Sequence, residues 1–402
     1  MTLSTIREIL VQSAEQFGQG DAVRYKAGKD QIETKSYVQL KQDSESFSLA
    51  LMDLGEQGAH VAVTGMTSYP WLVTYLGTVN CGCVAVPLDV SLPAEEMCEL
   101  ISRADVTTVV LDEIRMDVAA ILRQRCPEVK HLIMMKKEES DTEALSFTQL
   151  LAEHQGSCTY QPDPDSLCTI MFTSGTTGKS KGVMLTHRNM AENATCLDMK
   201  IPARTVILSV LPIHHAYCLS MDILKGLSLG SIICINDSLI RMAKNIQLFK
   251  PEMILMVPLM IETLAKKLED AAALPPQLVK QQVFGEQFHT ICSGGAYLTG
   301  RKKNLIITKN GENVSPEELE NKLGEYRLVQ EILVRENEGV IEAEIFPDLE
   351  YAAKKGIEDL QAALQERIDA YNRTAPAHKR VYRLKVRNTE FEKTPSKKIK
   401  RY

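Results

Sequence analysis

Residues 167–182 read LCTIMFTSGTTGKSKG, an apolar run followed at once by a loop of Gly, Ser, Thr and Lys. The apolar run predicts a buried strand. The loop, residues 173–182, has no apolar side chain to pack, but the backbone N–H groups of a Gly-rich turn can converge on one anion. Its hydroxyls add donors, and Lys179 and Lys181 add charge suited to a polyphosphate. A strand that leads into such a loop predicts a phosphate-binding site.

Two other interpretations of this loop compete with that one. The P-loop motif, GxxxxGK[ST], is excluded by spacing, because Gly178-Lys179-Ser180 would require a first glycine at residue 173, which is a threonine. A solvated linker has the same composition. Linkers of this kind do not usually lie between a buried strand and a helical pattern such as THRNMAENATCL at 186–197. We therefore expect a phosphate-binding loop with a different glycine frame.

Short apolar runs alternate with longer amphipathic stretches through most of the chain, which predicts α/β layers built on largely parallel sheet. The runs that predict strands are HVAVTG (60–65), TTVVLD (107–112), HLIMM (131–135), CTIMFT (168–173), VILSVLP (206–212), SIICIN (231–236), MILMVP (253–258) and HTICSGG (289–295). The stretches that predict helices are residues 36–55, 69–82, 93–104 and 257–272.

The pattern changes after about residue 300. Residues 304–323 predict a strand, a turn at Asn310-Gly311 and a helix capped by Ser315. Two strands, a helical pattern over roughly 354–372 and a late strand follow. This is the pattern of a small α+β domain.

Length and composition bound the class of protein. A chain of 402 residues is too long for one ordinary core, so we expect a large multi-layer α/β domain over 1–298 and a small α+β domain over 299–402. The net charge of −6 argues against nucleic acid as a partner. The start lacks a signal-peptide pattern and no apolar run is long enough to span a membrane, so we expect a cytoplasmic protein. Ten scattered cysteines, none in a CxxC pair, predict small buried side chains.

The segment TIMFTSGTTGKSKGVMLTHRN at 169–189 closely resembles the phosphate-binding signature of the adenylate-forming enzymes, which include acyl-CoA synthetases. Other segments resemble the family in the same order along essentially the whole chain. They are VAVTGMTSYPWLVTYLGTVNCGCVAVPLD, VLPIHHAYCLS, ICSGGAYL, GRKKNLIITKNGENVSPEELE and EKTPSKKIKR. Within that family, the sequences of these segments are most similar to those of bacterial long-chain acyl-CoA synthetases.

The resemblance implies a reaction in two steps. A carboxylate, expected to be that of a fatty acid, attacks the α-phosphate of ATP to give an acyl-adenylate and pyrophosphate. A thiol, that of coenzyme A or of a carrier protein, then displaces AMP. The family also implies Mg²⁺ as a cofactor. The protein would thus be an AMP-forming acid–thiol ligase.

The resemblance also implies roles for individual residues. Lys398 is the expected catalytic residue, His215 borders the acyl pocket, and Lys303 is the hinge of a mobile C-terminal domain. The β- and γ-phosphates would be held by Thr173, Ser174, Gly175, Thr176, Thr177, Gly178, Lys179 and Lys181. The nucleotide and acyl group would lie against Gly294, Gly295, Ala296 and Arg301.

Some of these residues also allow a purely structural interpretation. The basic tail that contains Lys398 could be a solvated end of the chain, and the chain has Lys397 where the family usually has glycine. Adjacent His214 and His215 could suggest a metal, although neighbouring histidines rarely face one ion and a pocket wall suits them better. No spacing predicts a metal site.

One junction departs from the family. The family places an aromatic-Gly-x-Thr-Glu motif and a Thr-Gly-Asp motif between its Ser-Gly-Gly-Ala segment and its Gly-Arg hinge. This chain reads SGGAYLTGRKKN, so roughly a hundred residues are absent between Leu298 and Thr299. The absent part would hold the residue that stacks on adenine, the magnesium glutamate and the ribose aspartate. Two functions therefore remain open: a working ligase, or a crippled relative that binds nucleotide, acyl chains or a partner.

Overall fold

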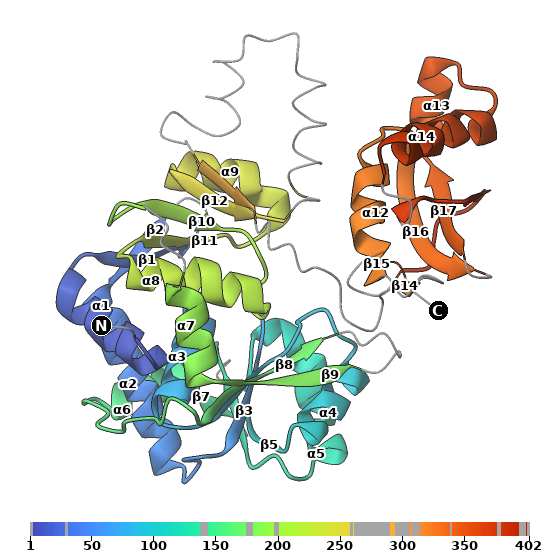
Figure 1. Cartoon of the computed structure of the whole chain (residues 1–402). Helices are drawn as coiled ribbons and strands as arrows, with labels where there is room; N and C mark the ends of the chain where they lie inside the picture. Colours follow the sequence, from blue (N-terminus) through green and yellow to red (C-terminus); the bar gives the residue numbers. More distant parts are fainter. Residues whose placement is uncertain are drawn as a thin grey trace. The chain divides into compact units, whose positions relative to one another are not determined.

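The computed structural model forms two compact units, one made by the described residues up to 293 and one by those from 306 onward (Figure 1). The described residues are 3–28, 31–136, 144–173, 180–196, 201–257, 260, 290–293, 306–307, 313–314, 316–337, 340–375, 379–393 and 399.

The first unit contains a seven-stranded sheet of order β7-β6-β5-β3-β4-β8-β9. Its strands are β3 (His60–Thr64), β4 (Val84–Pro87), β5 (Val106–Leu111), β6 (His131–Met134), β7 (Leu145–Ser146), β8 (Leu167–Thr173) and β9 (Lys181–Thr186). Neighbouring strands are parallel except β8 and β9, which form an antiparallel pair. The carboxyl ends of β3, β4, β5 and β8 therefore lie along one edge of the sheet.

A second sheet in the same unit has the order β13-β12-β10-β11-β1-β2. Its strands are β1 (Asp21–Lys26), β2 (Ile32–Ser36), β10 (Val206–Ser209), β11 (Ile232–Ile235), β12 (Met253–Met256) and β13 (Thr290–Ser293). All pairs are parallel except β1 with β2. Within the part of the chain that the structure describes, β13 is the last strand at its end of the sheet.

Helices cover both sheets. They are α1 (Ile6–Phe17), α2 (Tyr37–Asp53), α3 (Tyr69–Asn80), α4 (Ala94–Arg103), α5 (Met116–Arg125), α6 (Phe147–Glu153), α7 (His187–Thr195), α8 (Lys225–Ser228) and α9 (Met242–Phe249), with a π-helix at Cys218–Leu224 and 3-10 turns at Glu113–Arg115 and Leu239–Arg241. Their starts follow ordinary capping chemistry. Thr5 and Glu8 form a capping box at α1, and Ser36 and Ser68 cap α2 and α3.

One apolar core joins the two sheets. It contains side chains from β3 and β8 of the first sheet, from β10 and β11 of the second, and from α1, α2 and α3 between them. Trp71 and Tyr75 of α3 are fully buried in it, with ring centroids 5.9 Å apart. A second core lies between the seven-stranded sheet and α4 and α5 (Figure 1). The first unit is therefore a layered α/β body, as the sequence predicts.

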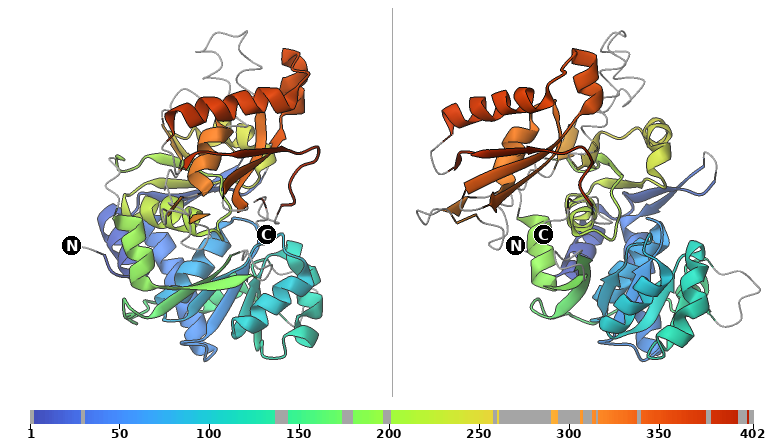
Figure 2. Two further views of the ribbon diagram at one scale, coloured as in Figure 1. Left: turned by 45° about the vertical axis from the view of Figure 1, so that its right-hand side comes forward. Right: turned by 90° about the vertical axis from the view of Figure 1, so that its right-hand side faces the viewer.

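The second unit is a small α+β body. It contains β14 (Ile306–Ile307) paired with β15 (Asn313–Val314), a three-stranded sheet of β16 (Val329–Asn337), β17 (Val340–Pro347) and β18 (Arg383–Val386), and helices α12 (Pro316–Gly324), α13 (Leu349–Lys355) and α14 (Leu360–Thr374). Figure 2 shows α14 lying along one face of this sheet. Alternate residues of β17 explain that packing: Ala343 and Ile345 face the helices, whereas Glu342 and Glu344 face away and pair with Arg335, Lys385 and Arg387.

The predicted strands and helices are confirmed wherever the structure describes them, with one correction. The helical pattern over 354–372 is two helices, because Gly356 ends α13 in a left-handed conformation (φ 66) and Asp359 caps a new helix. The strands β1, β2, β4, β7 and β9 were not predicted. The helix expected at 257–272 lies outside the described residues, apart from 257 and 260.

Candidate functional site

The Gly-rich loop connects β8 to β9. The two strands pair in antiparallel register from Leu167 with Thr186 to Thr173 with Lys181, so the sheet ladder holds both ends of the loop together. Thr173 and Lys181 are both exposed. The other predicted phosphate ligands, Ser174, Gly175, Thr176, Thr177, Gly178 and Lys179, lie outside the described residues.

The strand that leads into the loop is anchored deep in the core. Thr169 of β8 pairs with Ala85 of β4, and its Oγ1 lies 3.0 Å from the hydroxyl of Tyr75. Cys168 and Met171 are buried beside it. Such a base gives the start of the loop a fixed position, which a phosphate site needs if its donors are to converge.

Arg103 holds the other end of the loop. This last residue of α4 donates from Nη2 to the carbonyl oxygen of Ser180 at 2.8 Å, and its guanidinium lies 5.7 Å from the ring centroid of Phe172. The contact therefore joins α4 to both sides of the loop stem. Arg103 was not predicted from the sequence, because 77 residues separate it from Ser180 and no local pattern joins them.

His214 and His215 lie just before the π-helix, and their ring centroids are 4.3 Å apart. Asp89, in the turn after β4, places Oδ2 3.7 Å from Nε2 of His214. Its other oxygen, Oδ1, accepts hydrogen bonds from the backbone N–H and the hydroxyl of Ser91 at 2.8 and 2.7 Å. The structure thus joins Asp89, absent from the sequence predictions, to the predicted acyl-pocket histidine through His214.

Burial sets the charges of this group. It lowers the pKa of His214 to about 4; the neighbouring His215 lowers it further, while Asp89 opposes the shift. For Asp89, burial alone would raise the pKa, but the donors of Ser91 and the two histidines outweigh it, so the pKa falls below its usual value. At neutral pH the arrangement is a charged carboxylate beside a neutral imidazole.

The π-helix that follows contains a fully buried carboxyl group. Asp222 accepts a hydrogen bond on Oδ2 from the Ser209 hydroxyl at 2.9 Å, and its Oδ1 has no hydrogen-bond partner among the described residues. Burial raises the pKa of Asp222 to about 7, although Ser209 and Cys218 pull it the other way. π-Helical turns often occur at functional sites, and this one begins three residues after His215.

In the second unit, an isolated antiparallel bridge pairs Lys393 with Ile399. Lys393 forms ion pairs with Glu331 and Glu390, and Ile399 packs against Leu333, Phe346 and Phe391. These contacts fix both ends of the segment 393–399, which contains Lys398. Lys398 itself, with Gly294, Gly295, Ala296, Arg301 and Lys303, lies outside the described residues.

The described residues contain neither a cluster of metal-ligating side chains nor a helix that could span a membrane. No group of three or more His, Cys, Asp or Glu side chains there is arranged to hold a metal ion. No helix in the same residues has the length and apolarity needed to cross a membrane.

Comparison with known proteins identifies the family. Residues 10–302 match the model of the AMP-binding enzymes, and residues 303–402 match the model of the AMP-binding enzyme C-terminal domain. The chain belongs to the AMP-binding enzyme family.

Curated relatives of this AMP-binding protein include long-chain-fatty-acid–CoA ligase 5 of Rattus norvegicus, 26% identical over 299 residues, which cover 67% of this chain and 43% of the relative. The putative acyl-CoA synthetase YngI of Bacillus subtilis is 27% identical over 256 residues, which cover 57% of this chain and 46% of the relative. The chain therefore spans less than half the length of these relatives.

Solved structures share the fold. The adenylation domain of a carboxylate reductase from Mycobacterium chelonae has a TM-score of 0.73 at 17% identity, covering 98% of this chain and 88% of that one. ATP-bound MatB from Rhodopseudomonas palustris has a TM-score of 0.72 at 18% identity, covering 100% and 97%. At these identities the likeness concerns the fold alone.

Proposed function

We propose that the chain derives from an AMP-forming acid–thiol ligase that activates a carboxylic acid, specifically a fatty acid, with ATP and passes the acyl group to coenzyme A or a carrier-protein thiol. The match of residues 10–302 to the AMP-binding family carries this proposal. The β8–β9 stem supports it, because it holds the ends of a loop whose sequence has the family's phosphate signature.

The first step brings two anions together, since the acid attacks a phosphate. Positive charge at the developing pentacoordinate phosphorus is therefore the main requirement. In our proposal Lys398 supplies it, and the loop at 173–182 holds the β- and γ-phosphates. His215 forms part of the acyl pocket, and Gly294, Gly295, Ala296 and Arg301 hold the nucleotide. Mg²⁺ is proposed from the family resemblance alone, since no group of three or more His, Cys, Asp or Glu side chains among the described residues is arranged to hold a metal ion.

We place the domain boundary at Leu298–Lys303, with Lys303 as the hinge. The division of the described residues into two units supports this, as does the meeting of the two family models at residues 302 and 303. Rotation of a small domain about such a hinge would swap the adenylating face for the thioester-forming one.

A second candidate is a crippled relative that binds nucleotide, acyl chains or a partner without turnover. The junction SGGAYLTGRKKN favours it, because the segment absent there would supply adenine, ribose and magnesium contacts. This candidate shares the phosphate loop with the first. The two therefore differ in turnover and not in polyphosphate binding.

Thermal protection tests the phosphate loop in either case. Pyrophosphate or ATP should raise the melting temperature of the chain, because the donors of the loop are local. The double variant Lys179→Ala with Lys181→Ala should lose that rise. Lys354→Ala with Lys355→Ala, which removes the same charge from exposed positions of α13, should keep it. Equal protection of both double variants would overturn the assignment.

A further inference from the structure

Two buried thiols face each other across a single glycine. Cys81 ends α3 and Cys83 precedes β4, and their Sγ atoms are 3.5 Å apart. Neither side chain is exposed. From the sequence, the cysteines were expected to be small buried side chains; this pair is buried as expected, whereas Cys196 is exposed and corrects that expectation.

The turn between them requires glycine. Gly82 has φ 82, a left-handed conformation, and a Cβ there would lie 2.6 Å from the ring of Tyr160. This backbone places the flanking side chains together. Cys81, which donates to the sulfur of Cys83, also lies 3.4 Å from a second acceptor, the carbonyl oxygen of Thr78, whereas the acceptor for Cys83 is the carbonyl oxygen of Glu56 at 3.0 Å.

The two thiols differ in acidity. The hydrogen bond from Cys81 lowers the pKa of Cys83, which burial alone would raise, and the backbone amides of Gly58 and Ala59 lower it further. The same hydrogen bond, together with burial, raises the pKa of Cys81. Cys83 is therefore the thiol that ionises first, and the thiolate is the form that oxidants attack.

We propose that the Cys81-Gly82-Cys83 turn is an oxidation site at which a peroxide converts the two thiols to an intramolecular disulfide. The Cys83 thiolate attacks one oxygen of hydrogen peroxide, breaking the O–O bond, to give a sulfenic acid and hydroxide. The sulfur of Cys81 then attacks the sulfenic sulfur, the S–O bond breaks, and its thiol proton leaves with the hydroxyl group as water. Two thiols are oxidised and one peroxide is reduced.

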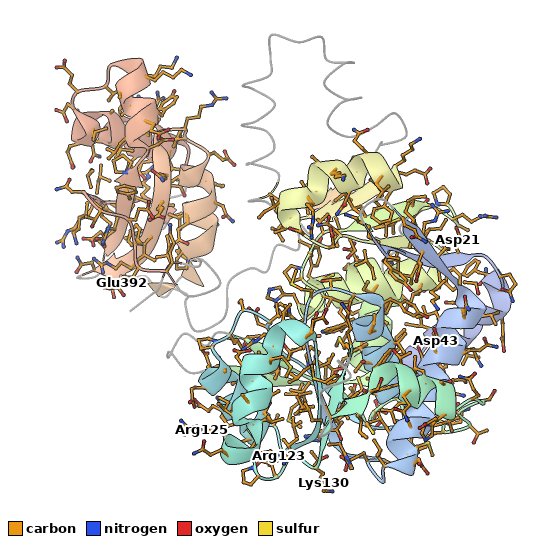
Figure 3. The ribbon with its side chains drawn as sticks, turned by 180° about the vertical axis from the view of Figure 1, so that it is seen from behind. Asp21, Asp43, Arg123, Arg125, Lys130 and Glu392 are labelled. Carbon is orange, nitrogen blue, oxygen red and sulfur yellow. The ribbon has the colours of Figure 1, made fainter. Side chains whose placement is uncertain are left out.

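Partly exposed residues lie directly beside this buried pair. Gly82 itself is half-buried, and the Tyr160 ring that covers it is also half-buried. The far side of the pair lies near the surface too, since the Glu56 carboxylate forms an ion pair with Lys130 at 3.4 Å, and Lys130 extends from the edge of the unit (Figure 3). Peroxide is little larger than water, so a small local opening admits it, whereas a bulky aromatic disulfide reagent stays outside.

Other cysteines of the same unit provide internal controls. Burial raises the pKa of Cys168 and of Cys234 to about 12, so both stay protonated and inert. Cys126 lies next to Cys98 as well: its Sγ donates to the Cys98 carbonyl oxygen at 3.4 Å, and burial, together with the neighbouring Cys126 thiol, raises the pKa of Cys98 to about 12. Cys196 is exposed and reports direct access.

The experiment treats the folded full chain with hydrogen peroxide, then denatures it, alkylates free thiols without reductant, and maps the peptides by mass spectrometry with fragmentation. We expect Cys81 and Cys83 to escape alkylation together, in a peptide lighter by two hydrogens that a reductant restores, while Cys168 and Cys234 stay alkylatable. Tyr160→Ala should speed the reaction several-fold, and Cys83→Ser should leave Cys81 fully alkylatable. Near-ultraviolet circular dichroism checks that each variant is folded.

Two results would overturn the proposal. One is a Cys81–Cys83 pair that stays fully alkylatable after Cys196 has been oxidised. The other is loss of alkylation at Cys168 and Cys234 at the same rate as at the pair, which would show that general unfolding exposes all thiols. Neither result bears on the phosphate loop, because the turn takes no part in the proposed ligase chemistry.

Discussion

Asp222 shows how a single buried acid can make stability depend on pH. The folded chain holds its pKa at about 7, against a usual value of 3.8, because burial disfavours the carboxylate. Between these two pH values the folded state keeps a proton that the unfolded state releases. The contribution of the protonated Asp222 carboxyl group to the free energy of unfolding is therefore fully present below about pH 4. It is lost as the pH rises through about 7.

We predict that Asp222→Asn stabilises the folded chain above pH 7 relative to the parent chain, and has little effect near pH 4. The amide is uncharged at every pH, so it escapes a cost of about 1.4 kcal/mol for each pKa unit of the shift. Urea denaturation from pH 4 to 8 measures the difference in free energy of unfolding. Asp165→Asn is the control, because Arg188 lowers the pKa of that exposed carboxyl. A difference that stays constant across the range would contradict the prediction.

Arg103 acts at the same scale on the loop stem. We predict that Arg103→Ala speeds backbone hydrogen exchange at residues 180–182 and weakens protection by pyrophosphate, because Ser180 loses the donor that ties it to α4. The contact is partly exposed, so the cost to global stability should be about 1 kcal/mol or less. Arg125→Ala, which removes an exposed ion pair with Glu95 from α5, is the matched control. Unchanged exchange at 180–182 in Arg103→Ala would exclude a role for Arg103 in the stem.

At the scale of elements, the break between α13 and α14 depends on Gly356. A side chain there would have open space around it, since no atom lies within 4 Å of where a Cβ would stand, but the left-handed backbone is strained for most residues. We predict that Gly356→Asn is nearly neutral and that Gly356→Val costs about 1 to 2 kcal/mol, because asparagine tolerates this conformation and a β-branched residue does not. Thermal unfolding of the second unit's helical signal measures both. A valine variant as stable as the asparagine one would show that the backbone there can rearrange.

The same break shows what a sequence pattern can and cannot predict. Parallel strands buried on both faces appear as continuous apolar runs, which is why β3, β5, β10, β11 and β12 were predictable. Helical periodicity, by contrast, continues across a single glycine, so α13 and α14 looked like one helix. Strand β9 was missed because Val183 and Met184 are 42% and 67% exposed and its run begins with lysine and glycine.

Some residues of the candidate site could be proposed from the sequence and others could not. The loop at 173–182 could be proposed from the sequence, because its donors are contiguous in the chain, and its phosphate-binding role stays a prediction. Asp89 and Arg103 could not be proposed, because each acts on a partner far away in sequence: Asp89 on His214 and Arg103 on Ser180. Asp89 follows β4 of the seven-stranded sheet and His214 follows β10 of the second sheet, while Arg103 ends α4 and Ser180 precedes β9. Only the tertiary fold brings such pairs together.

At the scale of the whole molecule, we propose that the main determinant of function is the segment that the family resemblance implies is absent. The described part of the second sheet ends at β13, whose sequence leads into the shortened junction. An exposed strand edge invites pairing with another chain. In our proposal the tether to the second unit is also shortened, because Leu298 is followed almost directly by Arg301 in the sequence.

We predict that ATP–pyrophosphate exchange by the chain stays near background with every acid from acetate to palmitate. By the family resemblance, the absent segment would supply the adenine and ribose contacts, so ATP should bind little better than inorganic triphosphate. Removal of part of a catalytic unit usually removes nearly all of its catalysis. The assay uses monomeric protein, selected by size-exclusion chromatography, so that aggregation cannot account for inactivity. Pyrophosphate protection of the same sample shows that the loop is intact. Robust exchange that disappears in Lys398→Ala would refute the crippled-relative alternative, because the remaining residues would then rebuild the adenylation site around that lysine.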